Sequence, residues 1–312
     1  MVDFARFMTA MVTPYTADGN VNYPFARRLA RHLVDIGNEG LVVTGTTGEA
    51  PLLSDDEKYR IWDEVKQEVG PNITVVAGAG TNDTHHSVEL TRLAERAGAD
   101  MVLAVAPYYL KPPQEGLYQH FKAMAEATAL PIIVYNVPGR TGVNITVDTL
   151  VRLSEIPNIV GDKEANGDLT AAAELMARAP GFKIWSGNDS DNFSLWCLGA
   201  YGAISVTGHL TASIQRQMYE AIRAGNVDEA AAIHRSLLPV TSACFLNGNP
   251  SSVRYAMRQF GIEIGPPRLP VVEPGEEVGG QIMSALRQAP LDLPAEPLDA
   301  AAAPSPHAAS PR

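Results

Sequence analysis

The sequence contains few cysteines, which limits its redox chemistry and its means of cross-linking. Its 312 residues include only Cys197, in the segment LWCLGA, and Cys244, in the segment SACFLN. Both segments are apolar with a helical pattern, and the two cysteines are far apart in the chain. We therefore expect two reduced thiols in the core rather than a disulfide or a catalytic nucleophile.

Basic clusters, long apolar runs and a secretion signal are also missing. The formal net charge of -11 disfavours a nucleic-acid partner, because binding to a phosphate backbone requires clustered Lys and Arg. No stretch approaches the ~18 apolar residues that a membrane span needs. The N-terminus lacks a basic region followed by a cleavable apolar segment. We expect a cytoplasmic protein with no nucleic-acid or membrane partner.

What the sequence does contain is a regular alternation of short apolar runs, rich in Val and Ile, with segments of helical period. The runs are continuously apolar, as in parallel strands that are covered on both faces. Each run and the helix after it span about 20 to 35 residues, which matches a unit of a closed (β/α)8 TIM barrel. Periodicity cannot show closure, so an open doubly wound sheet is the alternative. The runs begin at Phe7, Gly40, Ile73, Met101, Pro131, Asn158, Phe182 and Gly202.

This organisation predicts three regions in an α/β chain. Residues 1–224 form the barrel, and residues 225–288, which are helical in pattern throughout, form a C-terminal helical extension packed on it. From Ala289 the chain is rich in Ala and Pro with few large apolar residues, so we expect residues 289–312 to be a disordered tail. Within the barrel, Ser54 and Glu57 have the spacing of a capping box, which predicts the start of a helix.

The polar residues at the ends of the strands are the candidates for chemistry, because the active site of a TIM barrel lies at the C-terminal ends of its strands. The second run ends in GTTGEA, which places Thr46 and Thr47 at the rim. The glycines on either side leave backbone amides open to an anion. A glycine turn whose hydroxyls cap the local backbone would give the same pattern.

A tyrosine and a lysine end two neighbouring strands. The fifth run ends in YNVPGRTG and the sixth in GDKEANGD. Neighbouring strands lie about 4.8 Å apart, so Tyr135 and Lys163 can meet if both face inward, with Arg140 extending over the barrel mouth. A desolvated lysine can form a Schiff base with a ketone, and a tyrosine hydroxyl can shuttle the protons. The alternative is a structural lysine that is ion-paired with Asp162 or Glu164.

Six motifs together resemble the dihydrodipicolinate synthase (4-hydroxy-tetrahydrodipicolinate synthase) family. They are GTTGEAPLLSDDEK, APYYLKPPQEGLYQHF, YNVPGRTG, GDKEANGD, WSGND and GAISV, and they occur in the family's order. The resemblance extends from about Phe7 to Leu286. It implies a homotetrameric (β/α)8 enzyme that condenses pyruvate with aspartate-semialdehyde on the diaminopimelate route to lysine. It implies no metal and no organic cofactor.

The resemblance assigns four catalytic positions in this sequence. Lys163 is similar to the Schiff-base lysine of the family, and Tyr135 is similar to its proton relay. The relay would be linked to Thr46 and to Tyr109, which in this family comes from the neighbouring subunit. A dimer would therefore be part of the active site.

Four further positions resemble substrate-binding residues. Thr47 matches the residue that holds the pyruvate carboxylate, and Arg140 matches the one that receives the carboxylate of the aldehyde substrate. By similarity, Gly187 and Ile204 line the pocket through their backbones.

The chain departs from the usual pattern of the family at two places. Asp162 precedes the lysine where an apolar residue is common, and strand alternation predicts that it faces away from the barrel centre, with altered packing. Where lysine-inhibited members carry His and Glu residues that bind the inhibitor, this chain has Asp55, Lys58 and His86, although Asn82 is kept. A cationic Lys58 would repel the ammonium group of lysine, so we expect weak or absent feedback inhibition.

Three other interpretations of the sequence have less support. Adjacent His85 and His86 would point about 100° apart on a helix, which favours surface positions over a metal site. The rival functions are another pyruvate Schiff-base aldolase, such as an N-acetylneuraminate lyase or a 2-keto-3-deoxy sugar acid aldolase, and a catalytically silent barrel that binds a ligand. Arg140 disfavours the sugar aldolases, because the resemblance connects it to a small carboxylated aldehyde.

Overall fold

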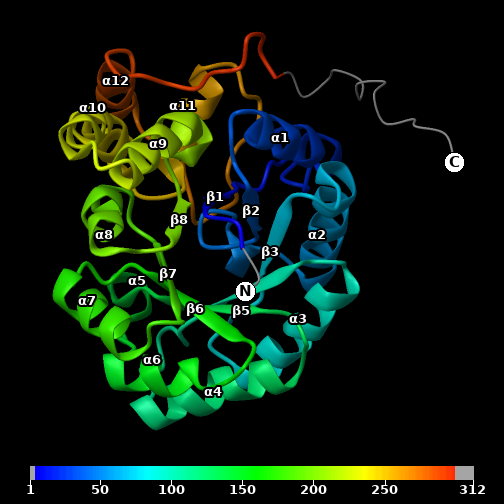
Figure 1. Ribbon diagram of the computed structural model, residues 1–312. Coiled ribbons are helices and arrows are strands. Elements are labelled where there is room, and N and C mark those ends of the chain that lie inside the picture. Colours follow the sequence, from blue (N-terminus) through cyan, green and yellow to red (C-terminus); the bar gives the residue numbers. More distant parts are fainter. Residues whose placement is uncertain (1–3, 299–312) are drawn as a thin grey trace, which may run out of the picture.

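A closed barrel of eight parallel strands forms the centre of the protein in the computed structural model, which describes residues 4–298 (Figure 1). Each strand pairs with the next, and β1 pairs with β8. Closure excludes the open sheet, and every predicted apolar run contains one strand. The strands are β1 (Phe7–Ala10), β2 (Gly40–Val43), β3 (Thr74–Gly78), β4 (Met101–Val105), β5 (Ile132–Asn136), β6 (Ile159–Glu164), β7 (Lys183–Ser186) and β8 (Gly202–Ser205).

Helices surround the barrel and cover the outer face of its strands (Figure 1). They are α1 (Tyr23–Asp35), α2 (Asp55–Val69), α3 (Thr84–Arg96), α4 (Gln114–Glu126), α5 (Pro138–Thr141), α6 (Val147–Ser154), α7 (Leu169–Arg178), α8 (Asn192–Leu198) and α9 (Gly208–Arg223). Two short 3-10 helices, η1 (Ala50–Leu52) and η2 (Asp189–Asp191), follow β2 and β7. Ser54 and Glu57 form the predicted capping box at the start of α2.

Strand alternation separates two apolar layers. On β5, Ile133 and Tyr135 belong to a cluster inside the barrel, together with Trp185 of β7. Val134 of β5 and Ile184 of β7 belong instead to the larger cluster between the strands and the helices. These residues show which side chains of β5 and β7 point into the barrel and which point toward the helices. Because β6 pairs with both strands, its alternate residues must point to the same two layers.

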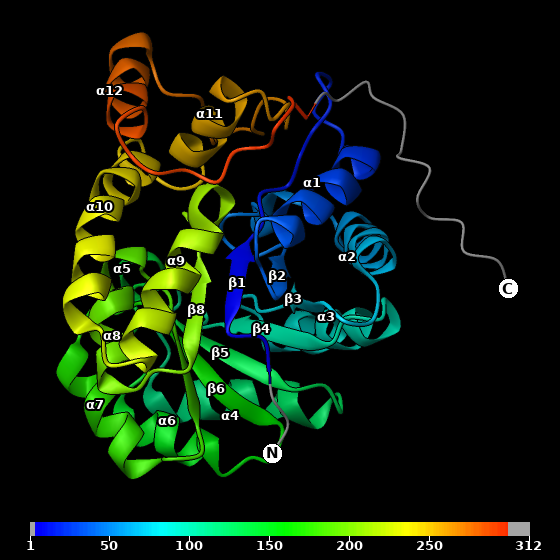
Figure 2. The ribbon, with the colours of Figure 1, turned by 45° about the horizontal axis from the view of Figure 1, so that its top comes forward.

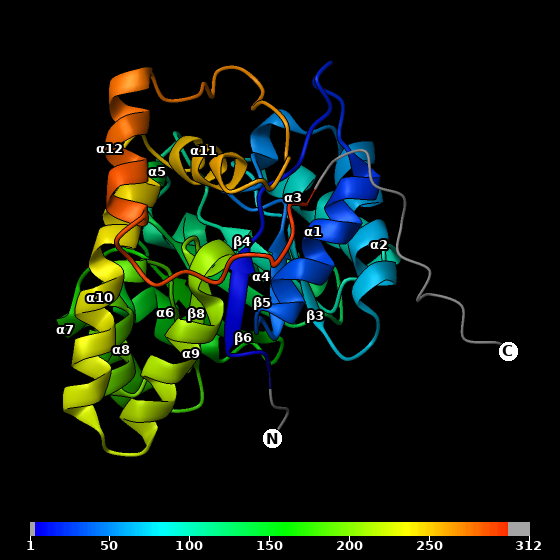
Figure 3. The same cartoon turned by 90° about the horizontal axis from the view of Figure 1, so that it is seen from above.

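Three more helices form the predicted C-terminal extension, α10 (Val227–Phe245), α11 (Ser251–Gln259) and α12 (Glu276–Leu286). Figures 2 and 3 show α10 and α12 side by side, with α10 also packed along α9. The buried guanidinium of Arg254 in α11 donates to the carbonyl of Thr13, after β1, at 2.6 Å and forms a 3.0 Å ion pair with Glu49. The extension is therefore attached directly to the loops at the rim.

Two predictions about the periphery were wrong. Residues 289–298 are ordered rather than a disordered tail, because Asp292 accepts hydrogen bonds from the backbone and the hydroxyl of Ser213 at 2.8 and 2.6 Å. The rest of the predicted tail, residues 299–312, lies outside the described residues. Cys244 is buried as expected, but Cys197 is exposed on α8, so only one of the two thiols belongs to the core. Within residues 4–298, no helix is both long and apolar enough to cross a membrane.

Candidate active site

Lys163 lies inside the barrel, where β6 approaches its end. In the strand register it is paired with Tyr135 of β5 on one side and with Trp185 of β7 on the other. The side chain is 4% exposed, and its Nζ lies 4.2 Å from the centre of the Tyr135 ring. The amine of Lys163 forms no hydrogen bond and no ion pair with any residue from 4 to 298. The alternative of an ion pair with Asp162 or Glu164 is therefore wrong.

Gly187, which directly follows β7, leaves room for the aliphatic part of the Lys163 side chain because it has no side chain of its own. The Gly187 N–H donates to the carbonyl of Glu164 at 2.7 Å, which brings the two backbones close together. A Cβ at this position would lie 3.1 Å from Cγ of Lys163. Ile204 of β8 is fully buried in the inner layer, so its side chain closes the barrel interior around the same region.

The GTTGEA loop is held by a set of short contacts. Thr44, which precedes it, has a left-handed φ of 58°, and its hydroxyl accepts a hydrogen bond from the Trp62 indole at 2.8 Å. A Cβ on Gly78 would lie 2.2 Å from the Thr44 carbonyl oxygen, so this close approach requires glycine. At the other end, Glu49 also has a left-handed φ of 58° and is paired with Arg254. These contacts fix the position of the two threonines between them.

A cavity of about 400 Å³ opens at the C-terminal ends of the strands. Thr46, Tyr135 and Arg140 line it, so the structure brings these three predicted residues to one space. Lys163 does not line the cavity itself but contacts the tyrosine ring that does. The amine is thus placed next to the cavity floor and away from bulk water.

Asn249, which precedes α11, joins two predicted binding residues and was not predicted from the sequence. Its side-chain Nδ2 donates to the buried hydroxyl of Thr47 at 2.9 Å, and its backbone carbonyl accepts from the guanidinium of Arg140 at 3.3 Å. Its position in NGNPSS indicated a turn and nothing more. The guanidinium of Arg140 is otherwise exposed at the rim.

Asp189 is a second residue that the sequence did not single out. Its buried carboxylate accepts hydrogen bonds from Ser205 and from the backbone N–H groups of Val206 and Thr207 at 3.0 and 2.9 Å. Burial raises its pKa, and these hydrogen bonds, together with the charge of Lys163, oppose that rise. Asp189 is therefore a buried carboxyl group whose charge interacts with the amine of Lys163.

Tyr109 is the one predicted catalytic residue that does not join the others. It is 84% exposed, lies on the loop after β4, and has a left-handed φ of 73°. Its backbone N–H donates to the carbonyl of Thr141, which fixes the loop while the ring projects into solvent. Tyr109 does not line the cavity of its own chain.

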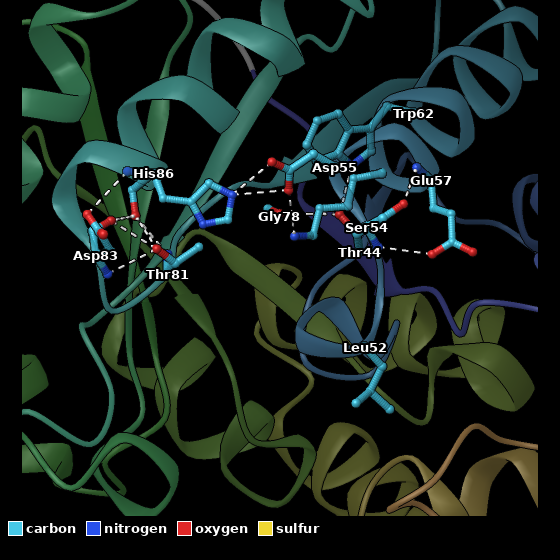
Figure 4. A network of polar contacts seen from close by, with 12 residues as sticks. Thr44, Leu52, Ser54, Asp55, Glu57, Trp62, Gly78, Thr81, Asp83 and His86 are labelled. Atoms are coloured by element: carbon cyan, nitrogen blue, oxygen red, sulfur yellow. Dashed lines mark hydrogen bonds and ion pairs between the residues drawn. The ribbon is translucent and has the colours of Figure 1, made fainter.

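The same cavity extends to the three residues that replace the family's inhibitor-binding pattern. His86 on α3 lies 3.0 Å from the carboxylate of Asp55 at the start of α2, as Figure 4 shows. The ammonium of Lys58, on a side chain that is 5% exposed, lies 3.5 Å from the same carboxylate. His85 lies near Glu89 instead. Among the described residues, no three His, Cys, Asp or Glu side chains are grouped as metal ligands.

Comparisons with known proteins agree on one family. The Dihydrodipicolinate synthetase family matches residues 3–289. A 4-hydroxy-tetrahydrodipicolinate synthase of Moorella thermoacetica is 49% identical over 92% of this chain and 99% of the relative. The crystal structure of a dihydrodipicolinate synthase from Bacillus anthracis, 42% identical, covers 93% of this chain and 100% of its own with a TM-score of 0.91. A lysine-bound synthase from Cyanidioschyzon merolae, 39% identical, covers 92% and 99% with a TM-score of 0.90.

Proposed function

The chain belongs to the Dihydrodipicolinate synthetase family, its 4-hydroxy-tetrahydrodipicolinate synthase relatives are lyases of lysine biosynthesis, and we propose that it condenses pyruvate with aspartate-semialdehyde through a Schiff base on Lys163. The product is 4-hydroxy-tetrahydrodipicolinate. The observation that carries the proposal is the amine of Lys163, which is buried, forms no salt bridge with a described residue, and contacts the ring of Tyr135, which lines the cavity. No metal or organic cofactor is required.

The first step is the attack of the Lys163 amine on the C2 carbonyl carbon of pyruvate. The new C–N bond gives a carbinolamine, and its hydroxyl leaves as water once it has gained a proton, which produces the iminium. Loss of a proton from C3 then gives an enamine. Its C3 forms the new C–C bond to the aldehyde carbon of the second substrate. Attack of that substrate's amino group on C2 closes the ring and releases the lysine.

These steps move protons at the carbinolamine, at C3 of the iminium and at the new hydroxyl. Tyr135 is suited to this role because its ring contacts the amine and lines the cavity, which Thr46 also lines. Tyr109 completes the relay only from a second copy of the chain, since its own ring projects into solvent. A homotetramer built from tight dimers provides that copy.

The carboxylates of the two substrates have separate anchors. Thr47 accepts a hydrogen bond from Asn249, which leaves its own hydroxyl proton to donate to the pyruvate carboxylate. Arg140 offers a forked cationic donor at the rim for the carboxylate of aspartate-semialdehyde. By similarity to the family, Gly187 and Ile204 would contact pyruvate through their backbones.

The choice of aldehyde is tested by steady-state kinetics with pyruvate and either aspartate-semialdehyde or sugar aldehydes. We expect turnover with aspartate-semialdehyde and a value of kcat/KM for the sugar aldehydes that is lower by orders of magnitude. Arg140→Met should raise KM for aspartate-semialdehyde while pyruvate still forms its adduct. Faster turnover with a sugar aldehyde would instead identify a sugar acid aldolase.

The role of Tyr109 is tested by mixing two inactive variants. Tyr109→Ala and Lys163→Ala each lack one residue of every site, but a mixed dimer contains one site in which both residues are native. We expect activity to return on subunit exchange, and sedimentation equilibrium to show an assembly of four chains. We propose that this assembly is cytoplasmic. A fully active monomer would contradict this part of the proposal.

A further inference from the structure

Two carboxyl groups are buried on the outer face of β6, next to the lysine. Asp162 is 0% exposed and Glu164 is 5% exposed. They are two residues apart on one strand, so they share a face, and that face is opposite to the one that carries Lys163. Asp162 is paired with Val134 and Ile184, both of which belong to the apolar layer under the helices. The predicted outward direction of Asp162 is confirmed.

The hydrogen bonds around this pair are unequal. Glu164 accepts from the backbone N–H of Asn166 at 2.6 Å and from Nδ2 of Asn136 at 3.3 Å. Neither oxygen of Asp162 has a donor of normal geometry among the described residues. The two carboxyl groups act on each other's pKa as neighbours within reach of a side-chain hydrogen bond. Two carboxylates cannot form such a bond, because an ionised carboxylate only accepts.

Within residues 4–298, no cation near this face of β6 compensates the two carboxyl groups. Helices α6 and α7 turn Leu150, Leu153, Ala172 and Leu175 toward the sheet. Their charged residues are exposed to solvent, in ion pairs on the far side of the helices. These residues are Asp148, Arg152, Glu174 and Arg178, with Glu115 from α4. Among the charged groups of the described residues, Glu164 is the one that acts on Asp162.

We propose that Asp162 is a protonated carboxylic acid that donates its hydrogen to Glu164, and that this shared proton makes the outer face of β6 a positioning element for the active site. The pair then carries a single negative charge. In this arrangement Glu164 accepts three hydrogen bonds, from Asp162, Asn136 and Asn166. Asp162 donates the shared proton, and the backbone N–H of Asn136, which lowers the pKa of Asp162, opposes that protonation without abolishing it.

Glu164 connects this face of β6 to two loops of the active site through its hydrogen bonds to Asn136 and Asn166. Asn136, at the end of β5, donates to Asn144 at 2.9 Å and accepts from the backbone of Ile145 at 3.0 Å. These contacts fix the far end of the loop that carries Arg140. Asn166 opens the loop after β6 and is held by the same carboxylate. Asp162 therefore acts as a positioning residue, through Glu164, on the strand of the lysine and on the arginine loop.

The direction of the pH dependence follows from the protonation states. Burial first, and then the neighbouring charge of Glu164, raise the pKa of Asp162 well above its ordinary 3.8. Between the unfolded and the folded pKa the native state binds the extra proton, so stability falls as pH rises through that window. The dependence amounts to at most a factor of about ten in the unfolding equilibrium constant per pH unit.

The experiment compares the intact enzyme with Asp162→Asn, which keeps a donor of similar shape but cannot titrate. Infrared spectra at neutral pH should show the carbonyl stretch of a protonated carboxylic acid in the native enzyme and its loss in D162N. Denaturant unfolding across the pH range should show the native protein losing stability relative to D162N as pH rises. Absence of the protonated band from the native enzyme would overturn the proposal whether or not D162N folds.

Glu164→Gln is the second variant, because it keeps Asp162 and removes its charged neighbour. The band should persist in E164Q and titrate at lower pH than in the native enzyme; titration at an unchanged or higher pH would contradict the proposal. Asp162→Leu removes the donor altogether. Resting on the proposed function, we expect D162L to raise KM for aspartate-semialdehyde several-fold more than it lowers formation of the pyruvate adduct. An equal loss of both would indicate a merely structural role, and the infrared result does not depend on the substrate.

Discussion

Replacing Gly187 with alanine tests whether the position of the reactive amine depends on the space that the neighbouring strand leaves. The new Cβ would lie 2.9 Å from the Cβ of Ala165 and 2.9 Å from the carbonyl oxygen of Glu164. It would lie 3.1 Å from Cγ of Lys163. The two closest contacts are with the backbone-fixed atoms of β6 and its loop, so this segment must shift, and the stem of Lys163 on the same strand moves with it.

The expected effect is larger on catalysis than on folding. Overpacking of this kind costs about 1–3 kcal/mol of stability. A displacement of a reacting group by ~1 Å can cost about a hundred-fold in rate. We therefore expect kcat of Gly187→Ala to fall by roughly two orders of magnitude, with slower trapping of pyruvate on the lysine. The assays are steady-state kinetics and the time course of adduct formation by mass spectrometry.

Gly181→Ala is the matched control, because a Cβ at that position meets no atom within 4 Å and Gly181 precedes the same strand, β7. It should behave like the native enzyme in both assays. A Gly187→Ala enzyme with native kcat and native adduct formation would refute the reasoning, since the lysine would then not depend on the space at position 187.

Three further predictions concern the rim and the C-terminus. Removing residues 299–312 should leave the melting temperature unchanged. Removing residues 289–312 should lower the melting temperature, because the hydrogen bonds from Ser213 to Asp292, worth about 1–3 kcal/mol, are lost. Turnover at low temperature should be kept in both truncated proteins. Added lysine at millimolar concentration should leave turnover nearly unchanged, because the ammonium of Lys58 lies in the cavity that would receive it; strong inhibition would contradict this. Asn249→Ala should raise KM for pyruvate several-fold, because the Thr47 hydroxyl loses its partner, and an unchanged KM would exclude Asn249 from the site.

The barrel could be predicted from the sequence because its signal is local. Continuous apolar runs and the spacing between them fix strand and helix positions. Alternation along β6 permitted an inward-facing Lys163 and predicted an outward-facing Asp162, and the structure has both. The motif resemblance placed Tyr135 and Arg140 at the same rim, where they line one cavity. These features depend on residues that are close in sequence or on adjacent strands.

The remaining features depend on contacts between residues far apart in the chain. Asn249 and Thr47 are separated by 202 positions, and no local pattern connects an Asn-Pro turn with a threonine at the barrel rim. Asp292 lies in a segment whose composition predicts disorder, yet it is held by Ser213 through specific hydrogen bonds. The proposed shared proton of Asp162 could not be inferred from the sequence either. Only the packing of the described residues around β6 shows that no cation compensates the two carboxyl groups.

The proposed function depends on the buried amine of Lys163 joining covalently to pyruvate. The direct measurement is borohydride reduction of the native enzyme in the presence of pyruvate, followed by peptide mass spectrometry, with Lys163→Ala treated in parallel. The account predicts a stable pyruvate adduct on the peptide that contains Lys163 and none on the variant. An unmodified Lys163 peptide, or an adduct on another lysine, would contradict it.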